Sequence, residues 1–281
     1  PQFKRFVLIG DHKQLPAVVV QDAQASAVQD KDLQSIGLSN LRNSLFERLY
    51  KRAKEQDWHW AYAQLSHQGR MHADIMQFPN RHFYENTLQI LPATVPTHKR
   101  QLATLTHAPN GEASELERLL CSQRLLFLAT DIDTTSVTQK TNRHEAALIA
   151  EILSLIRTAN GEPQIANRES QTANIGIITP YRAQIAQIRS VLHERGIDTA
   201  ALTIDTVERY QGGARDIILI SLCTNSPAQL ASLTSLSEEG IDRKLNVALT
   251  RAREQVIILG NAELLRQSPV YRALIEATTQ R

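Results

Sequence analysis

The pattern that decides the fold lies in residues 175–182, which read Ile175-Gly176-Ile177-Ile178-Thr179-Pro180-Tyr181-Arg182. The apolar run at the start of this stretch predicts a strand buried on both faces, and the Thr-Pro pair predicts where it ends. Apolar residues at helical spacing follow, namely Ile185, Ile188, Val191 and Leu192. A buried strand that leads into an amphipathic helix is the unit from which parallel sheets are built.

The same alternation recurs along the chain. Further strands are predicted for the runs at residues 6–9, 60–65, 125–129, 217–220 and 256–259. Helices are predicted over residues 43–54, over residues 71–83 with a break or kink at Pro79, and from Asn142 onward. At the start of the helix predicted from Asn142 onward, Asn142 and Glu145 are spaced like a capping box. Residues 22–40 and 160–172 are expected to be loops. We therefore expect an α/β protein with a parallel sheet covered by helices.

Length and composition favour a globular protein of one large or two small domains. The chain has 281 residues, of which 42% are hydrophobic and 21% charged, which argues against extended disorder. No apolar run approaches the ~18 residues that cross a bilayer, and no signal pattern is visible at the start. Because the chain begins with Pro1 and not Met, we expect it to be a fragment of a longer protein.

The cysteine and histidine patterns give no sign of a metal site. Cys121 and Cys223 form no CxxC pair and stand in apolar surroundings, so they are expected to be small core residues of a reduced, cytoplasmic protein. The nine histidines form no HExxH or Cys/His cluster, so no structural metal is expected.

Polar segments adjoin several of the predicted strands. Ligands of parallel sheets bind at the carboxyl ends of strands, which directs attention to the segments 10–16, 179–184, 206–213 and 245–253. Their Arg and Gln content suits a polyanion, because a guanidinium can meet phosphate oxygens in bidentate fashion. Each segment alone also has a plain structural interpretation, as a turn, an exposed helix face or a core tyrosine. The net charge of +2 does not decide between these interpretations.

Taken in order, these segments resemble the C-terminal half of the Upf1-like superfamily 1 helicases, which are ATP-driven motors with two RecA-like domains. Gly10–Pro16 is similar to motif III, Gln68–His72 to motif IV, Thr206–Asp216 to motif V and Leu245–Arg253 to motif VI. The resemblance implies a RecA-like parallel sheet with helices on both faces, as in the second domain of a P-loop NTPase helicase. It also implies that residues 1–68 are the tail of the first RecA-like domain and residues 69–281 the second.

The resemblance further implies roles for particular residues. Gln14 would sense the γ-phosphate, and Arg70 and Arg251 would contact it as arginine fingers, so these three are the candidate catalytic residues. The implied nucleotide-binding residues are Gly10, Asp11, Gln14, Arg70, Gln211, Gly212 and Arg251. The implied nucleic-acid-binding residues are Thr179, Pro180, Tyr181 and Thr206. The second arginine of motif VI, Arg253, is expected at a domain interface or on the surface.

The sequence departs from the family at motif V and lacks the phosphate-binding loop. Ala214 stands where the family commonly has a glutamate that helps to bind the nucleotide, and Glu208 stands where it has an aspartate. No GxxxxGK[ST] pattern occurs in the 281 residues. The implied cofactors, ATP and Mg²⁺, would therefore be bound mainly by a preceding N-terminal part, and the chain alone is expected to be inactive.

Three functions fit these observations to different degrees. The first is the C-terminal motor half of an ATP-dependent helicase that acts on single-stranded DNA or RNA, with the preceding RecA-like domain as its partner and no membrane involved. The alternative is a helicase-derived module that binds single strands without hydrolysing ATP, and an intact P-loop ahead of Pro1 would favour the motor. A Rossmann-type oxidoreductase fits the α/β pattern but lacks the GxGxxG fingerprint.

Overall fold

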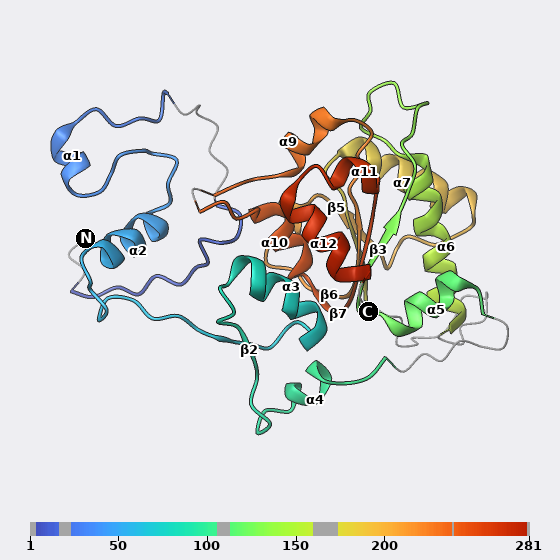
Figure 1. Cartoon of the computed structure of the whole chain (residues 1–281), viewed down its shortest axis with the longest axis horizontal. Coiled ribbons are helices and arrows are strands. Elements are labelled where there is room, and N and C mark those ends of the chain that lie inside the picture. The colour runs from blue at the N-terminus through green and yellow to red at the C-terminus, as the bar shows by residue number, and fades with distance from the viewer. Residues whose placement is uncertain (1–3, 17–23, 106–112, 160–173, 238, 280–281) are drawn as a thin grey trace. The chain divides into compact units, whose positions relative to one another are not determined.

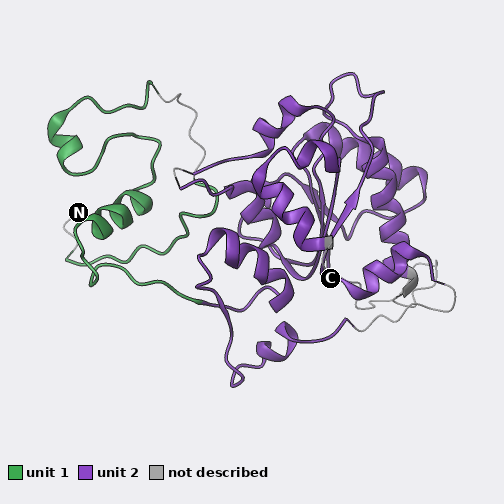
Figure 2. Cartoon of the chain, in the orientation of Figure 1, with its two compact units in different colours: residues 1–66 green, residues 67–281 purple. Residues whose placement is uncertain are grey.

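The chain folds as two compact units, Pro1–Ser66 and His67–Arg281, which Figure 2 shows in different colours. They are seen in a computed structural model that describes residues 4–16, 24–105, 113–159, 174–237 and 239–279. The predicted loop at 160–172 lies outside these residues. The assignment of the first unit to the tail of a preceding RecA-like domain stays a prediction. None of the described helices is long and apolar enough to span a membrane.

Unit 2 is built on a sheet of five parallel strands in the order β3-β7-β6-β4-β5. Their bounds are β3 Leu125–Ala129, β4 Ile175–Ile178, β5 Thr203–Asp205, β6 Arg215–Ser221 and β7 Ala252–Gly260. A separate pair of short parallel strands consists of β1 His67–Gln68 and β2 Gln89–Ile90. All four strands predicted in this unit are present, although β6 and β7 are longer than predicted and β5 was not predicted.

Helices lie on both faces of the five-stranded sheet (Figure 1). One face carries α6 Arg143–Ala159 and α7 Arg182–Glu194, with α5 Glu115–Ser122 beside them. The other carries α3 Ala73–Phe83, α10 Arg243–Leu249 and α12 Pro269–Thr279. The shorter elements are α4 Thr97–Gln101, α8 Val207–Tyr210, η1 Pro227–Gln229, α9 Leu230–Leu233 and α11 Ala262–Leu265. This arrangement confirms the predicted fold class.

The largest apolar cluster lies between the sheet and the pair α6–α7. Its fully buried members include Ile149, Ile152, Ile177, Ile188 and Leu219, which are residues of the predicted stripes and strands or their neighbours. Gly176 on β4 is required by a close approach, because a Cβ there would stand 2.5 Å from Tyr210 Oη and 2.9 Å from Arg215 Cγ. The strand thus needs a glycine in an otherwise apolar run.

Pro79 does not break α3, so the predicted break is wrong, while the alternative, a kink at Pro79, stays a prediction. The helix continues through Pro79 to Phe83. Pro79 is buried, as is its neighbour Phe78, which is 4% exposed. The missing N–H bond costs stability, and we infer that burial of the proline ring in the core offsets this cost.

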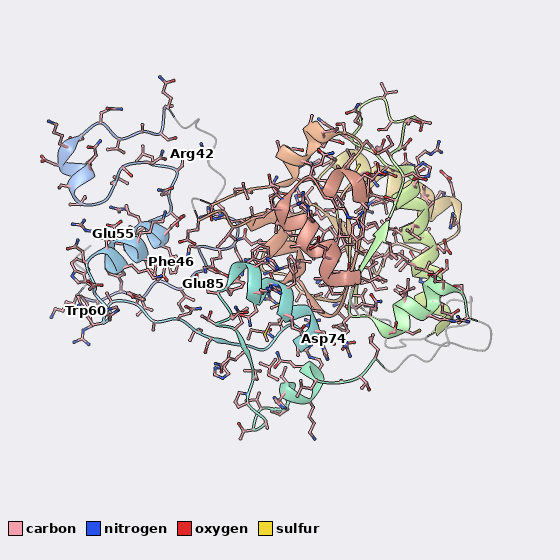
Figure 3. The ribbon with its side chains drawn as sticks, viewed as in Figure 1. Arg42, Phe46, Glu55, Trp60, Asp74 and Glu85 are labelled. Carbon is pink, nitrogen blue, oxygen red and sulfur yellow. The ribbon has the colours of Figure 1, made fainter. Side chains whose placement is uncertain are left out.

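In unit 1 two predicted strands are absent. Residues 6–9 and 60–65 have no strand conformation, and Ile9 and Trp60 are 91% and 85% exposed. The side chain of Trp60 lies at the outer edge of the unit in Figure 3. An isolated strand leaves its backbone groups unpaired, and no strand is present among the described residues of this unit to pair with them.

The helical prediction for residues 43–54 is confirmed by α2 Leu45–Glu55, which Ser44 caps by accepting a hydrogen bond from the Glu47 N–H at 3.1 Å. The described part of the expected loop at residues 22–40, from residue 24 on, contains a short helix, α1 Lys31–Ser35. Asp30 caps it through two backbone N–H groups, and this local cap explains why a polar segment without hydrophobic periodicity is helical.

Candidate functional site

The predicted nucleic-acid-binding residues are brought together at the carboxyl edge of β4 and β5. These strands are parallel neighbours, and the Thr179 N–H donates to the Asp205 carbonyl at 3.2 Å, next to Thr206. Thr179 is 1% exposed, yet its Oγ1 has no hydrogen-bond partner among the described residues. Buried hydroxyls are nearly always paired, so Thr179 Oγ1 can accept or donate a hydrogen bond to a group that binds there.

Tyr181 lies beside this edge at the start of α7. Its backbone occupies the N-cap position without a side-chain cap, and its Oη is 2.8 Å from Ser232 Oγ on α9. Lys244 Nζ on α10 donates to the Ser232 carbonyl at 3.1 Å and lies 3.7 Å from the Glu208 carboxylate. The α9 segment is therefore tied to both the β4 and β5 edges.

The Arg70 loop, residues 68–72, holds its arginine next to the segment that resembles motif VI. Arg70 Nη1 donates to the Thr250 carbonyl at 3.1 Å. Partial burial lowers the pKa of the Arg70 guanidinium, and the nearby charge of Arg253 lowers this pKa further. Arg253 itself is partly exposed and pairs with Asp216 at 2.9 Å. Two cations whose charges act on one another favour the binding of an anion beside them.

Arg251 is buried at 2% exposure between α10 and the glycine loop of motif V. Its Nε donates to the Val247 carbonyl at 3.1 Å, and its Nη1 donates to the Gly213 carbonyl at 3.4 Å. Gly212 next to it has φ +89°, a conformation that favours glycine. Of the predicted nucleotide site, unit 2 thus brings together Arg70, Arg251 and the Gln211–Gly213 loop.

The remaining predicted nucleotide residues lie in unit 1. Asp11 organises a tight turn there, because its carboxylate accepts from the Lys13 N–H at 3.0 Å and from Gln14 Nε2 at 2.8 Å. Gly10 adjoins the turn, and a Cβ at this position would stand 3.2 Å from the Phe46 ring. The structure therefore groups Gly10, Asp11 and Gln14 within their own unit.

A fully buried carboxylate, Glu145, was not predicted as a functional residue. Asn142 caps α6 as predicted, since its Oδ1 accepts from the Glu145 N–H at 3.0 Å. The Glu145 side chain does not complete the capping box. Its Oε2 accepts from Ser221 Oγ at 2.6 Å and from the Cys223 N–H at 3.0 Å, at the end of β6. Burial raises the pKa of Glu145 from 4.5 to about 7, although both hydrogen bonds lower it.

The same network reaches α7 and the loop after β3. Gln184 Nε2 donates to Ser221 Oγ at 3.1 Å, and its Oε1 accepts from the Asn142 N–H at 2.7 Å. Asn142 Nδ2 donates to Asn225 Oδ1 at 3.1 Å and to the Asp131 carbonyl at 3.0 Å. The loops that follow β3, β4 and β6 are therefore joined beneath the carboxyl edge. The only sequence signal for this network was the spacing of Asn142 and Glu145.

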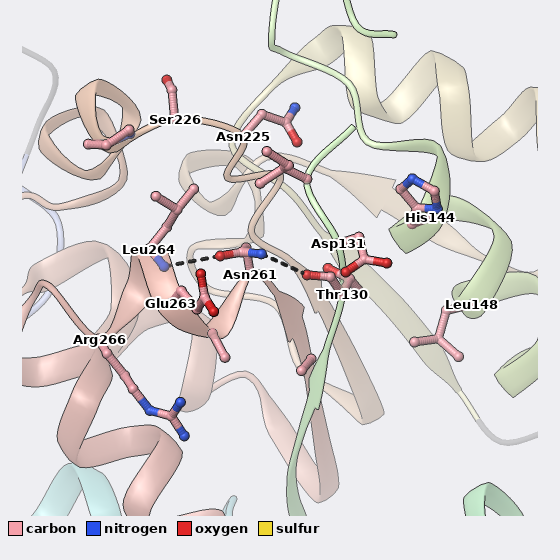
Figure 4. Close-up of a pocket in the computed structure, with 14 residues that line it drawn as sticks. Thr130, Asp131, His144, Leu148, Asn225, Ser226, Asn261, Glu263, Leu264 and Arg266 are labelled. Carbon is pink, nitrogen blue, oxygen red and sulfur yellow. Dashed lines mark hydrogen bonds between the residues drawn. The ribbon is translucent and has the colours of Figure 1, made fainter. Parts of the chain in front are cut away.

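A hollow of about 1000 Å³ opens at the carboxyl ends of β3 and β7 (Figure 4). Its polar walls include Asp131, His144 and Glu263, and Asn261 Nδ2 crosses its floor to the Thr130 carbonyl at 3.1 Å. Within the described ranges, no three Asp, Glu, His or Cys side chains are placed to hold a metal ion. The sequence predicted no site at this position.

Comparison with known proteins agrees with this architecture. The family described as "AAA domain" matches residues 41–263. The chain is 30% identical over 270 residues to the DNA polymerase alpha-associated DNA helicase A of Saccharomyces cerevisiae, covering 95% of this chain and 35% of the relative. It is 30% identical over 286 residues to Helicase sen1 of Schizosaccharomyces pombe, covering 99% and 14%. It is 29% identical over 276 residues to the regulator of nonsense transcripts 1 homolog of Neurospora crassa, covering 97% and 22%.

The fold and these similarities define a RecA-like helicase domain. The chain belongs to the AAA-domain family of the Upf1-like superfamily 1 helicases. It spans between 14% and 35% of the length of the three relatives named.

Proposed function

We propose that this chain is the C-terminal motor half of an ATP-dependent helicase that acts on single-stranded DNA or RNA. The observation that carries the proposal is the environment of Arg70. Among the described residues its guanidinium makes one hydrogen bond, to the Thr250 carbonyl, and it stands beside the like charge of Arg253. Its remaining donors suit the γ-phosphate of ATP, where charge develops during phosphoryl transfer.

Arg251 and Gln14 are each assigned a role toward the γ-phosphate. Arg251 is 2% exposed and donates to the Gly213 carbonyl, so its contact with phosphate requires the groups that cover its guanidinium to move. For Gln14, in unit 1, we propose the γ-phosphate-sensing role that the family resemblance implies, and we assign unit 1 to the end of the preceding RecA-like domain. Since no GxxxxGK[ST] pattern occurs in the 281 residues, the proposal leaves Mg²⁺ to the rest of the full-length protein.

Single-strand binding is assigned to the edge formed by Thr179, Pro180, Tyr181 and Thr206. The unpaired, buried Thr179 hydroxyl supports this assignment, because it gains a partner when a phosphate binds. Hydroxyl and backbone contacts of this kind bind phosphates without reading sequence. A module that binds single strands but does not hydrolyse ATP would use the same edge, so ATP turnover by the full-length protein separates the two functions.

The test is a measurement of phosphate release, with and without single-stranded DNA or RNA. The isolated chain should release none above a buffer blank. In the full-length protein, Arg70→Ala and Arg251→Ala should each lower kcat by roughly 10³- to 10⁵-fold, as expected for an arginine finger, with ATP binding comparatively intact. Near-wild-type turnover in both variants, or repurifiable turnover by the isolated chain, would contradict the proposal.

A further inference from the structure

The short helix α4 supports the Arg70 loop from behind, although it lies between the segments that resemble motifs IV and V. Gln101, at the end of α4, is completely buried. Its Nε2 donates to the Gln68 carbonyl at 2.8 Å and to the Met71 carbonyl at 3.0 Å, and its Oε1 accepts from the Leu91 N–H at 3.0 Å. Gln101 thus holds the Arg70 loop on both sides of the arginine.

Arg100, the neighbour of Gln101, connects the two arginine-bearing segments. Its Nη2 donates to the Gly69 carbonyl at 2.7 Å, immediately before Arg70. Its Nη1 donates to the Arg253 carbonyl at 3.4 Å. The His72 N–H donates to the same Arg253 carbonyl at 2.8 Å, which ties the other end of the Arg70 loop to this segment. One guanidinium therefore bridges backbone positions that are far apart in the sequence.

The chain that follows α4 is itself fixed to the sheet. Arg124 is 7% exposed, and its Nη2 donates to the Ala103 carbonyl at 2.6 Å while its Nη1 donates to the Glu254 carbonyl at 2.9 Å. His72 Nε2 also lies 3.0 Å from the Ala103 carbonyl. Glu254 belongs to β7, so Arg124 anchors the segment after α4 to the sheet. The support that α4 gives to the Arg70 loop therefore rests on a rigid element of the fold.

The charge of Arg100 suggests that this support serves the site. Gln101 shows that a neutral side chain can hold backbone carbonyls of the Arg70 loop. Arg100 instead brings a cation to the carbonyl of Gly69, next to Arg70 in sequence, and to that of Arg253. Like charges repel one another, so an anion bound in this region favours the arrangement. The planar guanidinium also suits the task, because it can donate to two carbonyls in fixed directions.

We propose that Arg100 is a positioning residue that fixes Arg70 relative to the segment 251–253, so that the Arg70 guanidinium meets the γ-phosphate in the transition state. This inference rests on the proposed function of Arg70. Arg100 acts through backbone carbonyls and not by contact with the nucleotide. A displacement of about 1 Å in a reacting group can cost ~10²-fold in rate, which sets the scale of the effect.

The experiment is a double-mutant cycle on ATP hydrolysis by the full-length protein. Arg100→Ala should lower kcat by ~10- to 100-fold and change the KM for ATP by less than about 2-fold. In an Arg70→Ala background, the same Arg100→Ala change should alter kcat by less than about 2-fold, because nothing remains to be positioned. Arg100→Lys should lie between, since one ammonium cannot hold both carbonyls in the same geometry.

Arg195→Ala is the matched control, because Arg195 is an exposed arginine after the C-terminal end of α7 and should leave kcat unchanged. Circular dichroism identifies any variant that fails to fold, and Arg100→Lys then supplies the measurement. Equal losses of kcat in the wild-type and Arg70→Ala backgrounds would overturn the positioning role alone. Near-wild-type turnover by Arg70→Ala would overturn the proposed function as well, so the two failures are distinguishable.

Discussion

Replacing Glu145 with glutamine should change how the stability of the chain depends on pH. The carboxylate is fully buried, and burial raises its pKa from 4.5 to about 7. Glutamine has nearly the same shape, can accept from the Cys223 N–H and does not titrate. The folded protein holds the proton more tightly than the unfolded chain does, so the stability from this group is complete below pH 4.5 and is lost as the pH rises through 7.

The size of the effect follows from these two pKa values. The difference between 4.5 and about 7 corresponds to roughly 3 kcal/mol at about 1.4 kcal/mol per pH unit. About 2 kcal/mol of this lies between about pH 5.5 and about pH 8.5. Relative to wild type, Glu145→Gln should therefore become about 2 kcal/mol more stable over that interval.

Urea unfolding at the two pH values, followed by far-UV circular dichroism, measures this difference. Tryptophan fluorescence is unsuitable, because the two tryptophans, Trp58 and Trp60, both lie in unit 1. Glu151→Gln is the control, since Glu151 is exposed on the same helix. If the stability difference between Glu145→Gln and wild type stayed constant within about 0.5 kcal/mol across the interval, the raised pKa of Glu145 would be refuted.

Two further substitutions test the β4 strand and its edge. Gly176→Ala should lower the free energy of unfolding in urea by about 1–3 kcal/mol, because its Cβ would meet Tyr210 Oη at 2.5 Å. An unchanged urea midpoint would mean that the Tyr210 side chain can move aside without cost. In the full-length protein, Thr179→Val should weaken single-strand binding by about 10- to 150-fold, the value of a lost hydrogen bond to a charged group. Stability should not fall, because the hydroxyl has no hydrogen-bond partner among the described residues. Unchanged affinity by fluorescence anisotropy would remove Thr179 from the strand site.

Four strands of unit 2, β3, β4, β6 and β7, could be predicted because each contains a short apolar run that the sheet buries. Residues 125–129 and 175–178 are strands with the predicted bounds. The run at 6–9 has the same apolar character, yet it is exposed and is not a strand, since pairing depends on neighbours that the run itself does not specify. The three-residue strand β5 was missed because it is too short to show a period.

The site was predictable only where its residues are close together in sequence. Thr179, Tyr181 and Arg251 stand in segments whose order carries the family resemblance. The direction of the Glu145 side chain depends on Ser221 and Cys223, which lie on a distant strand. A local capping pattern could not show that the Glu145 carboxylate points into the core, because the groups that donate hydrogen bonds to it lie far away in the sequence.

The place of β3 in the sheet has a consequence for synthesis. In the described sheet β3 pairs only with β7, and Leu125 lies opposite Val256. The first strand of the sheet to be synthesised therefore cannot pair until the last one has been made. Contacts this distant in sequence slow folding. While the chain is emerging from a ribosome, β3 has an unpaired edge of Leu-rich sequence until residue 260 is made, and such edges favour aggregation. The nascent chain should therefore depend on chaperones until β7 has been translated.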